Sequence, residues 1–517
     1  MDMHALLSDL ETEKKRIRLM GGIERLAKQE ERGKWHARQR LEHFFDEGAY
    51  IEIGMHGTTM GPFGTDKPAA DGVICGYGEV NGRMVCAAAY DFSVKGGSIG
   101  YIGEIKVARL RELALRSRVP MVWLIDSAGA RIDPSAHEDT IAMFAGSGAL
   151  FHDEVKMSGV IPLVAAMMGP GAAGTAYIPG LADFVPMVKG TSSMALGGPP
   201  LVKAATGEEI SEEELGGSKV HTRVSGVAHV EVDNDAGCIA TIKKYLSFFP
   251  SHCEEKPPII PCTDPIDRRD DTLLTILPEN PRAAYDMTTL LRHVVDHGDM
   301  LEIQPKFGKS IVTALARIGG YPCGFVASQP KHLGGVLEND SADKAAHFIQ
   351  VCDAFGIPLV FMVDVPGFMV GSKVEQAGII RHGAKMLHCM SSATVPKLTV
   401  IVRKAYGAGY YVMCGRAFEP DLLVAWPGAE VAVMGAEGMV GIASIKFGGI
   451  DNVDPEMKKQ MVSMVQSRID LKKSAGWGYI DDIIDPRDTR RILAQSLKLS
   501  WGRTVEHPKR KRGIMPV

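Results

Sequence analysis

Residues 120–129, PMVWLIDSAG, decide the fold, because their pattern returns at residues 358–367 as PLVFMVDVPG. The two stretches align without a gap at an offset of 238 residues, and the alignment extends over 82–129 and 320–367. The residues that recur include Pro120, Val122, Asp126 and Gly129, as Pro358, Val360, Asp364 and Gly367. An offset this long is not the repeat period of a solenoid, so we predict two domains of one fold in tandem.

Each half alternates short apolar runs with segments of helical pattern. In the first half, the apolar runs 83–89 (RMVCAAA) and 120–126 (PMVWLID) enclose the helical pattern 102–118. Apolar strands separated by helices of crossover length are typical of an α/β fold with largely parallel sheets. In such sheets, ligands bind where the chain leaves the carboxyl ends of the strands.

A stretch rich in proline and charge, residues 250–271, separates the two halves. Such a composition is typical of a linker. We place the N-terminal domain at 1–255, the linker at 256–271 and the C-terminal domain at 272–517. The densely charged helical segment 11–45 is expected to form a solvated face outside the first core.

Composition and charge argue against several classes of protein. The chain of 517 residues has a formal charge of −4 and therefore no overall basic field for nucleic acid. Its nine cysteines include no CxxC pair, which favours neither a zinc ribbon nor a disulfide framework. No apolar run of about 18 residues occurs, and the N-terminus lacks a signal-peptide core. We expect a cytoplasmic protein with no membrane span and no metal, located in the mitochondrial matrix if its source is eukaryotic.

Two turns of small residues follow apolar runs at equivalent places, GAAGT at 171–175 and GAG at 407–409. A turn of this kind between a strand and a helix frees backbone N–H groups where the helix dipole favours negative charge. The alternative is a tight turn that needs a positive φ or close packing. Because the turns recur in both halves, we predict two anion-stabilising sites that face one reaction.

Side chains suited to acid, base or nucleophilic chemistry are scarce. Asp126 and Asp364 end apolar runs and are expected to cap the turns that follow them. The segment 367–373 (GFMVGSK) lacks the spacing of a phosphate loop, and 154–157 (EVKM) is interpreted as part of a core helix, not as a biotin-attachment site. The surroundings of Ser127 do not form a nucleophile elbow.

Nearly the whole chain resembles the carboxyltransferase (β) subunits of biotin-dependent acyl-CoA carboxylases, of the propionyl-CoA and methylcrotonyl-CoA types. The matching stretches include GKWHARQRLEHFFDEGAY, PAADGVICGYGEVNGR, DFSVKGGSIG, LIDSAGARI, GPPLVKAATGEE, VDVPGFMVG, GIIRHGAKML and AWPGAEVAVMGAEG. The resemblance implies that the crotonase (ClpP-like) fold occurs twice.

The resemblance also implies a reaction. The N-terminal domain would bind acyl-CoA, and the C-terminal domain of a dimer mate would bind carboxybiotin. CO2 would pass to the α (or vinylogous γ) carbon of a short or branched acyl-CoA through enolates held in two backbone oxyanion holes. By resemblance, the N–H groups of Ala173 and Gly174 hold the thioester enolate, and those of Ala408 and Gly409 hold the ureido oxygen of biotin.

Further site residues come from the same resemblance. Those expected to contact the acyl-CoA substrate are Gly96, Gly97, Gly129, Ala130, Arg131, Tyr177 and Tyr411. Gly367 and Phe368 are expected to join Ala408 and Gly409 at biotin. The Ala-Gly pairs at both holes are similar to methylcrotonyl-type members, whereas GIIRHGAKML is similar to propionyl-type members. The acyl group is therefore left open.

The chain has no biotin-carrier lysine motif and no biotin carboxylase segment. Biotin would therefore have to come from a separate α subunit that contains the biotin carrier and the biotin carboxylase. By resemblance, we expect a hexameric core of this chain. Two alternatives stay open: a carboxyltransferase subunit of a biotin-dependent decarboxylase or transcarboxylase, and a scaffold that binds acyl-CoA without catalysis.

Overall fold

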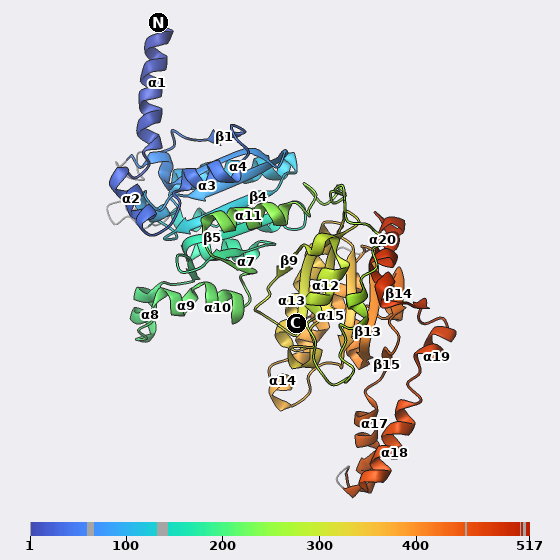
Figure 1. Cartoon of the computed structure of the whole chain (residues 1–517). Helices are drawn as coiled ribbons and strands as arrows, with labels where there is room; N and C mark the ends of the chain where they lie inside the picture. The colour runs from blue at the N-terminus through green and yellow to red at the C-terminus, as the bar shows by residue number, and fades with distance from the viewer. Residues whose placement is uncertain are drawn as a thin grey trace. The chain divides into compact units, whose positions relative to one another are not determined.

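The structure is a computed structural model that describes residues 2–58, 67–131, 143–449, 452–506, 508–509 and 513–516 (Figure 1). Side chains at 143, 144, 446 and 447 are outside the description. The chain divides into two compact units, Met1–Glu255 and Lys256–Val517. Residues of the expected linker contact the second unit, since Arg490 donates to the carbonyl oxygens of Asp264 and Pro265.

Unit 1 is built on a mixed sheet. Among the described residues the sheet has eight strands in the order β1-β2-β3-β4-β5-β6-β8, and β7 pairs with the end of β5. The pairs β1–β2 and β2–β3 are antiparallel, and the pairs from β3 to β8 are parallel. The strands are β1 Tyr50–Ile53, β2 Val73–Val80, β3 Arg83–Tyr90, β4 Met121–Ser127, β5 Leu163–Ala172, β6 Pro186–Val188, β7 Ser193–Ala195 and β8 Val230–Val232.

Helices cover this sheet on two faces. The strand β4 is buried along its whole length, because its alternate side chains face opposite helical layers. Trp123 and Ile125 share a core cluster with Val107 and Leu110 of α4, and α3 packs with α11. The helices are α1 Met3–Arg18, α2 Ile23–Glu31, α3 Ala37–Phe44, α4 Tyr101–Ser117, α6 Ala149–Met157, α7 Gly174–Leu181, α8 Pro199–Thr206, α9 Glu212–Gly216, α10 Ser218–Arg223 and α11 Asp235–Leu246.

Unit 2 repeats this arrangement. Its described strands follow the order β9-β10-β11-β12-β13-β14-β16, and β15 pairs with the end of β13 as β7 does with β5. The strands are β9 Met300–Ile303, β10 Ile311–Ile318, β11 Tyr321–Ser328, β12 Leu359–Val365, β13 Lys397–Tyr406, β14 Leu422–Ala425, β15 Glu430–Ala432 and β16 Asp482–Ile483. The tandem α/β fold predicted from the repeat is thereby confirmed.

The helices of unit 2 follow the same plan. On one face, α12 and α20 form a core cluster with the sheet, while α13 packs with α15. The helices are α12 Met287–Val294, α13 Asn339–Ala354, α14 Ser372–Gln376, α15 Ile379–Ser392, α16 Gly407–Val412, α17 Ala436–Ala443, α18 Pro455–Gln466, α19 Leu471–Gly476 and α20 Thr489–Ser500. Short 3-10 helices are η2 Ala69–Gly72, η3 Lys95–Gly97, η4 Met143–Gly146, η5 Asp271–Leu274, η6 Asp296–Gly298, η7 Leu333–Gly335, η8 Arg416–Phe418, η9 Ser444–Phe447 and η11 Pro486–Asp488.

The expectation for segment 11–45 is partly wrong. The helix α1 is largely exposed, as predicted, but α3 contributes the buried side chains of Leu41 and Phe44 to the first core. Arg40 of α3 is also fully buried. The charged composition of the segment did not indicate that one face of α3 is buried. Arg40 can be buried there because its guanidinium forms ion pairs with Asp126 and Asp235 inside the unit.

No helix among the described residues is both long and apolar enough to cross a membrane. Within the same residues, no group of three or more His, Cys, Asp or Glu side chains could hold a metal ion.

Candidate active site

Both small-residue turns lie where a central strand ends and a helix begins. Ala173 follows β5 and precedes α7, and Gly407 follows β13 and begins α16. Both residues have left-handed backbones, with φ of 51° at Ala173 and 55° at Gly407. Each turn therefore bends its chain sharply at the carboxyl end of a parallel strand, which is where α/β sheets bind ligands.

In the first turn only one of the two expected donors is free. The N–H of Ala173 donates to the carbonyl oxygen of Ala195 at 3.1 Å, which ties the turn to β7. The N–H of Gly174 has no acceptor among the described residues. The Thr175 hydroxyl accepts from the N–H of Ala172 and donates to the carbonyl oxygen of the same residue, both at 2.9 Å. The end of β5 is thus fixed while Gly174 keeps its donor.

In the second turn the N–H groups of Ala408 and Gly409 have no acceptor among the described residues. Both belong to the first turn of α16, whose N–H groups have no partner within the helix. Ala408 is exposed, and Gly409 is buried against β12. The turn therefore offers two backbone donors without any charged side chain of its own.

Packing explains some of the glycines and leaves one unexplained. A Cβ on Gly409 would lie 2.8 Å from Val365 Cγ2, and one on Gly407 would lie 2.9 Å from the carbonyl oxygen of Val433. On Gly174, the nearest atom to a Cβ would be Cζ of Phe151, at an ordinary 3.5 Å. Gly174 has no positive φ either. Its lack of a side chain is therefore consistent with the close approach of a ligand.

The loops that follow β4 and β12 flank the two turns in the same way. In unit 1, the Ile99 N–H donates to the carbonyl oxygen of Gly129 at 2.8 Å, and the Arg131 N–H donates to that of Ile99 at 3.0 Å. In unit 2 the Leu337 N–H donates to the carbonyl oxygen of Gly367 at 3.0 Å, and the Met369 N–H donates to that of Leu337 at 2.7 Å. A Cβ on Gly129 would lie 2.7 Å from the carbonyl oxygen of Ala172, so this loop abuts the first turn.

Gly96 and Gly97 are glycines for backbone reasons. Their φ angles are 65° and 62°, and a Cβ on Gly97 would lie 2.2 Å from the carbonyl oxygen of Asp126. In unit 2, a Cβ on Gly335 would lie 2.6 Å from the carbonyl oxygen of Asp364. Both glycines shape the loop beside the turn, and Ala130 lies exposed on the neighbouring loop.

Asp126 and Asp364 were expected to cap turns, and this prediction is wrong. Asp126 accepts from Lys34 Nζ at 2.8 Å and from Arg40 Nη1 at 2.9 Å. Asp364 accepts from Arg403 Nε at 2.9 Å and from the N–H of Lys404 at 3.2 Å. Burial raises the pKa of Asp364, while the Arg403 charge lowers it. Both carboxyl groups instead tie the carboxyl end of a central strand to another element.

The aromatic candidates lie on the helices that begin at the turns. Tyr177 on α7 and Tyr411 on α16 are each 52% exposed. Tyr177 packs edge-on against Phe151 with ring centroids 5.8 Å apart, and Tyr411 lies 6.1 Å from the ring of Phe418. Phe368 is half-buried, beside Gly383 of α15. Each tyrosine ring is thus available to a ligand at its own turn.

Unlike the two tyrosine rings, the Arg131 side chain already has partners within the protein. Its guanidinium is bonded to Asp71 and Ser98. Sequence reasoning missed Asp71 and Thr175. The internal repeat could have indicated that Asp71 and Arg131 interact. At the equivalent positions unit 2 has Lys309 and Met369, so both residues of the ion pair are replaced together. Thr175 carried no comparable signal.

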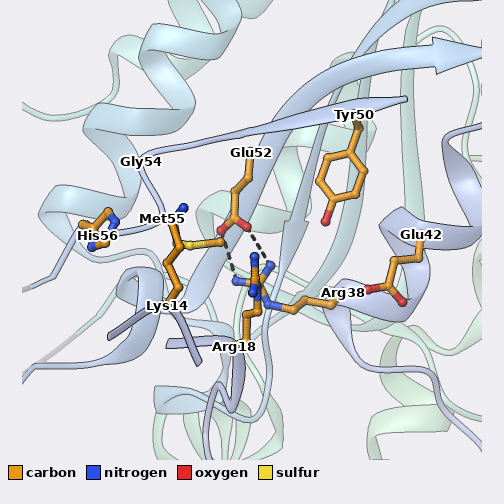
Figure 2. A pocket seen from close by; sticks show the side chains of 10 residues that line it. Lys14, Arg18, Arg38, Glu42, Tyr50, Glu52, Gly54, Met55 and His56 are labelled. Atoms are coloured by element: carbon orange, nitrogen blue, oxygen red, sulfur yellow. Dashed lines mark hydrogen bonds and ion pairs between the residues drawn. The ribbon is translucent and has the colours of Figure 1, made fainter. Parts of the chain in front are cut away.

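A cavity of about 660 Å³ lies elsewhere in unit 1, between α1, α3 and β1 (Figure 2). At its centre Arg38 donates to both carboxylate oxygens of Glu52, at 2.6 and 3.1 Å. The other lining residues are Lys14, Arg18, Glu42, Tyr50, Gly54, Met55, His56 and Gly57. The site residues expected from the sequence do not line this cavity.

Comparison with known proteins identifies the family. Residues 28–515 match the model of the carboxyl transferase domain. The chain belongs to this family. It is 40% identical to the methylmalonyl-CoA decarboxylase subunit alpha of Propionigenium modestum, over 99% of each chain. It is also 40% identical to the propionyl-CoA carboxylase beta chain of Roseobacter denitrificans, over the full length of both.

A solved structure supports the same conclusion for the fold. The transcarboxylase 12S hexamer with methylmalonyl-coenzyme A and methylmalonic acid bound has a TM-score of 0.94 and 38% identity, over 100% of this chain and 99% of that one. The resemblance seen in the sequence is confirmed. This protein is a carboxyltransferase subunit of the biotin-dependent acyl-CoA carboxylases and decarboxylases.

Proposed function

We propose that this carboxyltransferase moves a carboxyl group between biotin and the α carbon of a short acyl-CoA, with backbone N–H groups as its main catalytic groups. The observation that carries the proposal is the free N–H of Gly174 at the carboxyl end of β5, repeated at Ala408 and Gly409 in unit 2. Enolates of a thioester and of a urea both carry charge on oxygen, and fixed N–H donors stabilise such charge without reorganising.

At the acyl-CoA site, Gly174 would donate to the thioester oxygen. Because the N–H of Ala173 is bonded to Ala195, we assign Ala173 the task of directing the Gly174 N–H through its left-handed backbone. Thr175 and the loop at Gly129 would fix the turn from either side. Tyr177, exposed on α7, would pack against the substrate.

At the biotin site, the residues present fit a neutral ureido group. Ala408 and Gly409 offer two N–H donors, and Gly367 lies directly beside Gly409, since a Cβ on Gly409 would be 3.1 Å from Gly367 Cα. Phe368 would pack against the ring system. Biotin, carried by a separate α subunit, would supply or accept the carboxyl group, and these residues would hold its ureido oxygen.

The relatives favour a propionyl-type substrate. The two curated relatives are named for methylmalonyl-CoA and propionyl-CoA, which differ by one carboxyl group, and the 12S structure holds methylmalonyl-CoA. We propose the same pair as the substrates of this chain, with Tyr411 from the C-terminal domain of a dimer mate bordering the acyl group. The 12S hexamer likewise supports a hexameric core. One relative is a decarboxylase and the other a carboxylase, so we propose that the α partner sets the direction.

The test is biotin-dependent decarboxylation of malonyl-CoA, methylmalonyl-CoA and methylglutaconyl-CoA by the purified chain, with biocytin as acceptor. We expect methylmalonyl-CoA to react fastest. Gly174→Val places methyl groups over the N–H at a position where a Cβ meets only an ordinary contact, so the variant should fold and lose roughly 100- to 1,000-fold in kcat.

Gly180→Val is the matched control, because Gly180 lies on the same helix and a Cβ there meets no atom within 4 Å. It should keep wild-type turnover. Turnover by a folded Gly174→Val variant within twofold of wild type would refute the assignment of the first hole. Binding of acyl-CoA without turnover of any ester, even after addition of a biotin-carrying α subunit, would favour the scaffold.

A further inference from the structure

Arg131 lies in the loop that follows β4, and two other loops of unit 1 hold its guanidinium. Nε donates to Ser98 Oγ at 3.1 Å, and Nη2 donates to the carbonyl oxygens of Ser98 at 3.0 Å and Asp71 at 3.2 Å. Nη1 forms an ion pair with Oδ1 of Asp71. The side chain of Asp71 is 1% exposed and that of Arg131 is 15% exposed. The pair is therefore largely screened from water, where such bonds are strong.

The same aspartate caps the helix that follows the second loop. Oδ2 of Asp71 accepts from the N–H of Gly103 at 2.6 Å, in the first turn of α4. Gly100, the residue before α4, has no side chain to cap the helix itself. A Cβ on Gly100 would lie 2.4 Å from Arg131 Nη1 and from Asp71 Oδ2. The glycine thus leaves room for the ion pair, and the pair replaces the missing cap.

This arrangement reaches the first oxyanion hole through the backbone. The N–H of Ala128 donates to the carbonyl oxygen of Gly96 at 2.9 Å, and Gly129 abuts Ala172. Within the loop 127–131, Ala128 is therefore fixed by the 95–99 loop, and Arg131 is fixed by its ion pair with Asp71. Its middle lies against the turn that presents the N–H of Gly174.

The backbone that carries Asp71 is itself strained. Ala70 and Asp71 have φ angles of 48° and 50°, in the left-handed region that side chains disfavour. A conformation of this kind persists only where surrounding contacts hold it, and such residues concentrate at functional sites. The holding contacts include the bonds from Arg131 and Gly103 to Asp71, and the bond from Lys106 Nζ to the carbonyl oxygen of Ala70 at 2.9 Å.

Unit 2 shows that the fold does not require the pair. Lys309 and Met369 occupy the equivalent positions, and Glu338 replaces Gly100. The backbone bridge from Leu337 to the loop is kept, but α13 forms its own capping box, in which the N–H of Glu338 donates to Ser341 Oγ at 2.8 Å. The ion pair is therefore an addition specific to the acyl-CoA unit.

We propose that Asp71 and Arg131 are positioning residues for the acyl-CoA half of the reaction. They hold the loop 127–131 against the Gly174 turn, so that the hole keeps the geometry that the thioester enolate needs, and they have no part in the biotin half. The inference rests on the proposed function. It gives Arg131 a positioning role, and the direct contact of Arg131 with the substrate stays a prediction.

The test uses the full chain and compares three variants with wild type. The double variant Asp71→Asn with Arg131→Met removes both charges and copies the methionine of unit 2, so it avoids an unpaired buried charge. Arg131→Lys keeps the charge but not the forked geometry. The control is Arg38→Met with Glu52→Gln, which removes a largely buried pair, at 8% exposure of each side chain, outside the proposed site.

Decarboxylation of methylmalonyl-CoA is measured with biocytin, and calorimetry with the CoA ester counts the folded sites. We expect the double variant to bind one ester per chain, to lose about 10- to 100-fold in kcat and to keep the KM for biocytin within twofold. Arg131→Lys should recover part of that loss, and the control should keep full activity.

Two results would overturn the inference while the proposed function stands: wild-type kcat in the double variant, or a KM for biocytin that rises as much as kcat falls. If wild type itself turns over no ester, even after addition of a biotin-carrying α subunit, the proposed function fails and the inference fails with it.

Discussion

Glu154 offers a sharp test of the buried electrostatics of unit 1. It lies on α6 with no exposed surface, and neither of its carboxylate oxygens has a hydrogen-bond partner among the described residues. Burial raises the pKa of Glu154 from 4.5 to about 9, although the charge of Arg111 opposes the rise. We expect the folded protein to keep this carboxyl group protonated at neutral pH.

The magnitude follows from proton linkage. Between pH 4.5 and about 9 the unfolded chain releases the proton and the folded chain keeps it, so the free energy of unfolding falls as the pH rises. Each pH unit in this window costs about 1.4 kcal/mol. From pH 5.5 to 8.5 the loss is therefore about 4 kcal/mol, which corresponds to a Tm change of at least about 8 °C for a unit of this size.

Glu154→Gln removes the titration and keeps the shape of the side chain. The variant should gain stability relative to wild type as the pH rises, with the difference in Tm widening by that amount between pH 5.5 and 8.5. Any change in stability from burying the amide of the glutamine is the same at both pH values. It therefore cancels when the two Tm differences are compared. Thermal unfolding by circular dichroism measures it, with Glu112→Gln on the exposed face of α4 as the control. Equal Tm differences at the two pH values would refute the reasoning.

Two further predictions concern the second unit and the thiols. Asp296 accepts from Arg490 Nη2 and from the N–H groups of Gly319 and Gly320, each at 2.7 Å. Burial raises the pKa of Asp296, but these donors outweigh it and hold that pKa below 3.8, so its stabilisation is present at neutral pH and lost in acid. Asp296→Asn should cost about 1–3 kcal/mol, because Arg490 then keeps only its longer ion pair with Asp264, at 3.5 Å, as counter-charge. A thermal scan against the exposed Asp271→Asn control checks this, and an unchanged Tm would contradict it. Of the nine free cysteines only Cys253 is exposed, and burial raises the pKa of Cys75 to about 11. Ellman's reagent should therefore label one thiol per native chain quickly and nine in urea, and Cys253→Ser should remove the fast phase, whereas rapid labelling of several thiols would argue against this packing.

Sequence patterns were sufficient for the fold because they are local and repeated. The apolar run at 120–126 and its copy predicted central strands, and both became fully buried strands, β4 and β12. Gly-rich turns at 171–175 and 407–409 were predicted to follow strands, and the structure places both at strand ends. These features depend on side-chain period and backbone freedom, which neighbouring residues determine by themselves.

Partners distant in the sequence could not be predicted. Asp126 was expected to cap its own turn, but its carboxylate forms ion pairs with Lys34 and Arg40 from the charged N-terminal segment. The bond from Ala173 to Ala195 leaves only Gly174 free at the first turn. Such choices depend on which side chains and carbonyl groups the packed sheet brings together.

The sequence by itself therefore determined the tandem α/β fold, the carboxyltransferase family and the positions of the two turns. Only the tertiary structure decided which donors stay free, which carboxyl groups are paired and that Arg131 is engaged by Asp71. The physical reason is that a hydrogen bond or ion pair between segments tens to hundreds of residues apart depends on strand register and helix packing. Local sequence patterns do not encode these.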